Sequence, residues 1–66
     1  MQITLNGDPK TLEDGLTILG LLQELGYQER RLAVECNGDI IPRSQHASTV
    51  LHDGDTVEIV MAVGGG

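Results

Sequence analysis

Few side chains of this 66-residue chain could perform chemistry, and those few are scattered along it. His46 and His52 have no cysteine or further histidine near them, so no metal site is expected and both are predicted to be surface or turn residues. Cys36, the only cysteine, continues the inward alternation of a strand and is expected to be a small core residue rather than a reactive thiol. Asp53 and Asp55 flank a glycine, and a turn explains them better than an acid–base pair, which needs an enclosing cleft.

The remaining candidate for chemistry is the run of three glycines at positions 64–66. Glycine has no Cβ and adopts backbone conformations that are closed to other residues. Three extended glycines reach about 10 Å. The tail would therefore form a thin probe, ending in an α-carboxylate, that fits a narrow tunnel in another protein. The alternative is a frayed terminus or a remnant of cloning.

The elements that would position this tail are predicted from periodicity. Apolar alternation and turn residues predict short strands at residues 1–5, 10–13, 32–36, 40–41 and 56–63. Asn6-Gly7 and Asn37-Gly38 predict tight hairpin turns, because both residues of such a pair can take positive φ. Pro9 places the second strand at a sheet edge, since proline cannot donate to a ladder.

One helix is predicted between the two hairpins. Thr17 is expected to cap its start and Gly26 to end it in the left-handed conformation. Its apolar stripe consists of Ile18, Leu21, Leu22 and Leu25. Gly20, inside the helix, is expected to permit close approach to the sheet.

One amphipathic helix must bury its stripe against one face of one sheet. Parallel pairing of the first and last strands at the sheet centre would let both hairpins flank them. This arrangement is an α+β, ubiquitin-like β-grasp fold, with a mixed sheet of four to five strands and one main helix on one face. We expect a β-grasp domain over residues 1–63 and a flexible glycine tail over residues 64–66.

Composition excludes several classes of function. The net charge of −6 argues against nucleic acid binding and is compatible either with a partner that offers a basic face or with simple solubility. No apolar run approaches the roughly 20 residues that span a bilayer, and a single cysteine suits a reducing compartment, so a cytoplasmic protein without membrane contact is expected. A chain this short has little room for an active-site cavity of roughly 300–1,000 Å³, so an independent enzyme is not expected.

The whole chain resembles the sulfur carrier proteins of thiamine biosynthesis, the ThiS family. The resemblance rests on residues 1–3, 21–25, 34–38, 41–46, 51–59 and 65–66. The Asp-Gly-Asp turn and the diglycine end are shared with other sulfur carriers, including the small subunit of molybdopterin synthase. The Pro-Arg-x-x-aromatic-or-His segment is more typical of the thiamine proteins. One departure is Gly64, where many carriers have another small residue.

The resemblance implies a protein co-substrate rather than an enzyme. An E1-like adenylyltransferase would adenylate the Gly66 carboxylate with ATP and magnesium, and sulfur from a cysteine desulfurase would convert it to a thiocarboxylate. Thiazole synthase would then take the sulfur. The chain itself would bind no cofactor and would be a monomer when free. The alternatives are a carrier for molybdopterin or cysteine synthesis, and a noncovalent ubiquitin-like interaction module.

Other residues receive roles within that scheme. Gly64 and Gly65 would give the tail access to a tunnel. Val60 and Ala62, on the face of the last strand opposite the helix, are candidates for partner docking, unless a hairpin covers them. Arg43 would either pair with an acidic group of a partner or lay its apolar stem along the surface.

Overall fold

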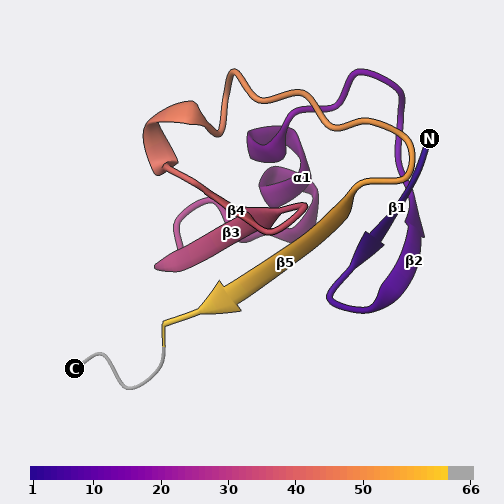
Figure 1. Ribbon diagram of the computed structural model, residues 1–66. Helices are drawn as coiled ribbons and strands as arrows, with labels where there is room; N and C mark the ends of the chain where they lie inside the picture. The colour runs from indigo at the N-terminus through magenta and orange to yellow at the C-terminus, as the bar shows by residue number, and fades with distance from the viewer. Residues whose placement is uncertain (63–66) are drawn as a thin grey trace.

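The computed structural model describes residues 1–62 and contains one five-stranded mixed sheet with a helix on one face (Figure 1). The strand order is β2-β1-β5-β3-β4, in which β1 and β5 pair in parallel and the two hairpins flank them. This confirms the predicted β-grasp fold. In chain order the elements are β1 (Gln2–Leu5), β2 (Asp8–Thr11), α1 (Ile18–Leu25), β3 (Leu32–Cys36), β4 (Asp39–Ile41), a 3₁₀ helix (Arg43–Gln45) and β5 (Thr56–Met61).

The two Asn-Gly turns form as predicted, and their asparagine side chains hold neighbouring strands. Asn6 and Asn37 have φ values of 49° and 53°, and a glycine with positive φ follows each. The Oδ1 atom of Asn6 accepts from Ile59 N at 2.8 Å, while that of Asn37 accepts from Thr56 N at 2.9 Å. The first turn has only two residues, so β2 begins at Asp8 and not at the predicted residue 10.

Helix α1 has both predicted caps. The Thr17 side chain accepts from Gly20 N at 3.1 Å, and Gly26 has a φ of 75°. The amides of Gly26 and Tyr27 donate to the carbonyls of Gln23 and Leu22, which is the hydrogen-bond pattern of a Schellman motif.

The expectation that Gly20 permits close approach to the sheet is wrong. A Cβ added at Gly20 would lie 2.6 Å from the Cδ1 atom of Leu16, and the next nearest atoms belong to Leu16 and Thr17. The missing side chain therefore makes room for the residue that leads into the helix.

The core lies between α1 and the inner face of the sheet, and it is entirely aliphatic. The predicted stripe is buried at three positions and partly buried at Leu25. Cys36 is partly buried against this core, close to its predicted place. The buried apolar residues are Ile3, Leu12, Ile18, Leu21, Leu22, Val34, Leu51, Val57 and Ile59. Within residues 1–62, no helix has the length and apolar character needed to cross a membrane.

His46 corrects the prediction of a surface histidine. It lies at the end of the 3₁₀ helix, where a turn was expected, but only 5% of it is exposed. Its Nε2 atom lies 3.0 Å from the carbonyl oxygen of Ile41, and its own carbonyl accepts from the amide of Leu19 at 2.9 Å. His46 thus anchors the segment after β4 onto the first turn of α1. His52 is exposed, as predicted.

Candidate functional site

Strand β5 ends beside the loop that joins α1 to β3. Leu32 pairs with Met61 at the start of β3, and the amide of Ala62 donates to the carbonyl of Arg31 at 3.0 Å. The end of the central strand is therefore held at the edge where this loop lies. The predicted sulfur-bearing and tail-access residues, Gly66, Gly64 and Gly65, lie outside the described residues, as does Val63.

The face of the sheet opposite α1 presents an apolar patch beside this end of β5. Val60 is 60% exposed, Ala62 is also exposed, and both line an open depression of about 360 Å³ together with Ala33 and Met61. No hairpin in residues 1–62 covers Val60, so the predicted alternative for these residues is wrong. The two residues are placed where a partner that approaches the end of β5 can reach them.

The same face carries a hydrophobic residue that sequence reasoning missed. Ile40 is 64% exposed, and it lies directly opposite Glu35, which is in turn opposite Glu58. Residues opposite each other in an antiparallel pair point to the same face of a sheet. We therefore define the outer face by Ala33, Glu35, Ile40, Glu58 and Val60. Alternation along β4 could have indicated Ile40, because its neighbour Ile41 must point inward.

The carboxylates of the outer face form no ion pair within the described residues, although Arg31 lines the depression beside Val60. Like charges directly opposite each other in a sheet are destabilising. The only ion pair in residues 1–62 joins the amino group of Met1 to Asp14. The Glu35–Glu58 pair therefore makes the outer face suited to a partner surface that combines apolar side chains with a basic group.

Removing one of these charges should stabilise the free protein. We expect Glu58→Gln to raise the free energy of unfolding by about 0.2–1 kcal/mol, because it removes the repulsion from Glu35. Urea denaturation followed by circular dichroism measures the change. Glu13→Gln, in the exposed loop after β2, is the matched control and should change stability less. An equal or larger gain in the control would contradict the repulsion.

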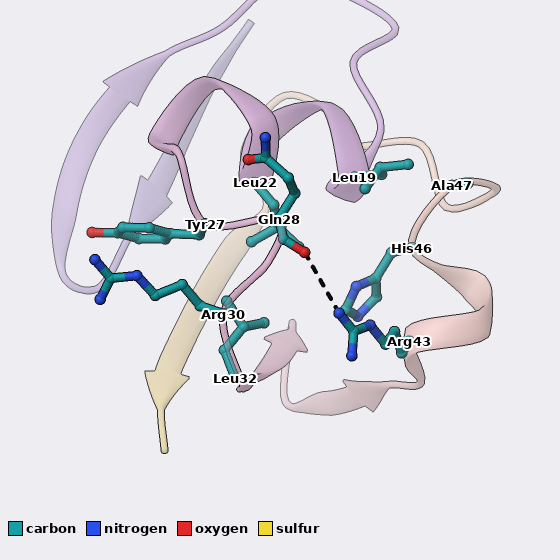
Figure 2. Close-up of a pocket in the computed structure, with 9 residues that line it drawn as sticks. All are labelled: Leu19, Leu22, Tyr27, Gln28, Arg30, Leu32, Arg43, His46 and Ala47. Carbon is teal, nitrogen blue, oxygen red and sulfur yellow. Dashed lines mark hydrogen bonds between the residues drawn. The ribbon is translucent and has the colours of Figure 1, made fainter. Parts of the chain in front are cut away.

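Arg43 lies in a different place from the other docking candidates. It lines a pocket of about 200 Å³ on the α1 side of the sheet, formed by α1, the loop after it and the segment 43–47 (Figure 2). The floor of this pocket is apolar (Leu19, Leu22 and Leu32), and its polar residues lie on two sides, with Tyr27 and Arg30 on one and Arg43 and His46 on the other. The structure thus brings Val60 and Ala62 together and separates Arg43 from them.

The acidic and thiol groups near the Asp53-Gly54-Asp55 turn have structural roles. Burial raises the pKa of Asp55, but hydrogen bonds from Asn37 and the His52 amide outweigh burial and lower it below its ordinary value. Burial, and then the charge of Asp55, raises the pKa of Cys36, so its thiol stays protonated and weakly nucleophilic at neutral pH. No group of three or more potential ligands among the described residues could hold a metal ion.

Comparison with known proteins matches both the sequence and the fold. The model of the ThiS family matches residues 3–66. The chain is similar to the crystal structure of the thiamine biosynthesis protein ThiS from Geobacter metallireducens, with a TM-score of 0.85 and 35% identity over 100% of both chains. It is 32% identical to the sulfur carrier protein ThiS of Escherichia coli (strain K12), again over 100% of both chains.

A longer relative is also similar. A thiazole synthase of Paramagnetospirillum magneticum is 41% identical over 100% of this chain, which spans only 20% of that protein's length. The match to the family model over nearly the whole chain, and the likeness to full-length carriers of the same fold, show that the chain belongs to the ThiS family of sulfur carrier proteins.

Proposed function

We propose that the chain carries sulfur for the thiazole part of thiamine, with the carboxyl group of Gly66 as the carrying group. The observation that supports this best is the family match through residue 66, which includes the glycine run. The likeness to a region of a protein named thiazole synthase favours thiazole synthase as the enzyme that takes the sulfur. The chain acts in this scheme as a co-substrate of partner enzymes.

The chemistry explains why an activating partner is required. A carboxylate is a poor electrophile, so an E1-like adenylyltransferase would use ATP and magnesium to form an acyl-adenylate at Gly66 and release pyrophosphate. The outer sulfur of a persulfide, supplied by a cysteine desulfurase, would attack the carbonyl carbon and displace AMP. A thiol would then reduce the resulting acyl disulfide and leave the thiocarboxylate.

The described residues would act by docking. Glycines lack a Cβ, so the tail could enter a tunnel that excludes side chains. Docking on the outer face would bury Val60, Ile40 and Ala33 and bring a basic group of the activating enzyme to Glu35 and Glu58. The end of β5 lies beside this face, so one partner could bind the face and receive the tail.

The proposal is tested by charging the protein in vitro. The chain is incubated with the E1-like enzyme, ATP, magnesium and a cysteine desulfurase with cysteine, and its intact mass is measured. We expect a gain equal to the exchange of one oxygen for sulfur, located at Gly66 by fragmentation. Omission of ATP is the control. The E1-like enzyme must first be shown to charge its own carrier. If this active enzyme leaves the mass of the chain unchanged, the proposal is rejected and a noncovalent interaction module is favoured.

A matched pair of valine substitutions tests the docking role of the outer face. Val60→Asp should slow thiocarboxylate formation at least tenfold, because it places a charge in an apolar contact beside two carboxylates. Val50→Asp is the control: Val50 is also exposed, at 42%, but it lies in the segment that bridges to Thr17, away from the outer face. The initial rate at subsaturating carrier measures both. Similar rates for the two variants would remove Val60 from the docking surface.

A further inference from the structure

The basic side chains of this acidic protein are few and unevenly placed. The chain has four lysines and arginines against ten acidic residues, and two of the four, Arg30 and Arg43, line the same pocket. Neither forms an ion pair with a carboxylate in residues 1–62. Figure 2 shows the two guanidinium groups on opposite sides of the pocket: that of Arg43 points towards Gln28, and that of Arg30 lies at the outer edge beside the Tyr27 ring. Because no carboxylate of residues 1–62 pairs with either group, the pocket has positive charge that is complementary to an anion.

The pocket combines this charge with an apolar floor. Leu22 and Leu32 come from α1 and from the inner face of β3, and the Schellman motif places Tyr27 next to Leu22. The guanidinium of Arg30 lies 5.9 Å from the centre of the Tyr27 ring, within the range of a cation–π contact. An aliphatic group that entered the pocket would therefore meet leucine side chains below and positive charge at the rim.

Arg43 and His46 form the opposite wall (Figure 2). One terminal nitrogen of Arg43 donates to the carbonyl of Gln28 at 3.5 Å, a long hydrogen bond that leaves its other donors available. His46 is buried, and its Nε2 atom donates to Ile41, because a carbonyl oxygen can only accept. The imidazole is thus fixed in orientation at the wall of the pocket.

We propose that this pocket, named here the arginine pocket and defined by Leu22, Tyr27, Arg30, Leu32, Arg43 and His46, binds a carboxylate-bearing side chain of a partner protein together with an adjoining aliphatic group. Its volume of about 200 Å³ is below the roughly 300–1,000 Å³ of small-molecule sites and suits one or two side chains. Guanidinium groups bind carboxylates through paired, charge-assisted hydrogen bonds.

The position of the arginine pocket indicates which partner this is. The loop that carries Tyr27 and Arg30 continues to Arg31, whose carbonyl accepts from Ala62 at the end of β5. The arginine pocket and the outer face therefore flank that end from the two sides of the sheet. We assign the carboxylate to an enzyme that receives the tail, and this assignment rests on the proposed function.

Charge reversal tests the assignment with the partner enzymes. Dissociation constants are measured by calorimetry for the E1-like adenylyltransferase and for thiazole synthase. Arg30→Glu and Arg43→Glu should each weaken binding to at least one of them by tenfold or more. Lys10→Glu, on the edge strand β2, changes the net charge equally and should have less than a twofold effect. The proposal would be overturned if the dissociation constants of both arginine variants, for both enzymes, lay within twofold of that of the lysine control.

A small probe tests the arginine pocket without any partner. Isocaproate carries an aliphatic group and a carboxylate, and isocaproamide is its neutral isostere. In amide NMR titrations, isocaproate should produce saturable shifts at Leu22, Leu32 and His46 that isocaproamide does not, and Arg43→Gln should weaken them. Equal shifts from both probes, or none from either, would overturn the proposal. If wild-type protein binds neither enzyme, the proposed function fails, and this titration alone decides whether the arginine pocket binds a carboxylate.

Discussion

Deletion of Gly66 is expected to abolish thiocarboxylate formation while leaving the domain folded. The deletion moves the terminal carboxyl group back by one residue, about 3.3–3.6 Å in an extended chain. A reacting group misplaced by as little as about 1 Å can lose about a hundredfold in rate. The activating enzyme would therefore hold the shortened tail with its carboxylate out of reach of ATP. The buried core residues of the described part of the chain run from Ile3 to Ile59, so the shortened chain keeps all of their side chains.

The measurement separates a loss of chemistry from a loss of fold. Intact mass after incubation with the E1-like enzyme, ATP and a sulfur donor reports charging, and a thermal melt reports stability. A chain extended by one glycine after Gly66 tests whether the position of the carboxylate decides charging. It keeps Gly66 but moves the carboxylate outward by one residue, so it should also fail to gain sulfur. A shortened chain that still gained sulfur would show that Gly66 is not the carrying residue.

The sequence carried enough information for the fold because its signals are local and mutually consistent. Thr17 and Gly26 mark the ends of the helix through capping chemistry, and the Asn-Gly turns fix the register of both hairpins. The predicted bounds of the elements therefore differ little from the observed ones; the start of β2, for example, is two residues earlier than predicted. The parallel pairing of the first and last strands does not follow from these local signals; it was predicted because it lets both hairpins flank the central pair, and the structure confirms it.

The segment between β4 and β5 was harder to predict because it has no regular periodicity. Nothing in residues 42–49 indicates that His46 turns inward, and its partners Ile41 and Leu19 are identified only by the fold. The same holds for the arginine pocket, since Arg30 and Arg43 belong to different loops. The glycine run was recognised from sequence because it needs no tertiary partner to have its chemical meaning.

Leu22→Ala should remove most of the stability of the domain. Leu22 is only 3% exposed, and it lies on the buried stripe of α1. Truncation of a buried leucine to alanine costs about 2–5 kcal/mol through lost burial and the cavity left behind. A domain of this size has roughly 3–5 kcal/mol in total. A large fraction of the variant is therefore expected to be unfolded at room temperature.

Urea denaturation followed by far-ultraviolet circular dichroism tests this value, with osmolyte added if the variant is unfolded in buffer. Leu25→Ala is the matched control, because Leu25 belongs to the same stripe but is only partly buried, so its truncation exposes a smaller cavity and should cost less. A loss below about 0.5 kcal/mol at Leu22 would mean that the floor of the arginine pocket can close over the missing side chain. We expect the cavity to stay open, because β-pairing fixes Leu32 and the Schellman motif fixes the end of the helix. The full loss of unfolding free energy then follows.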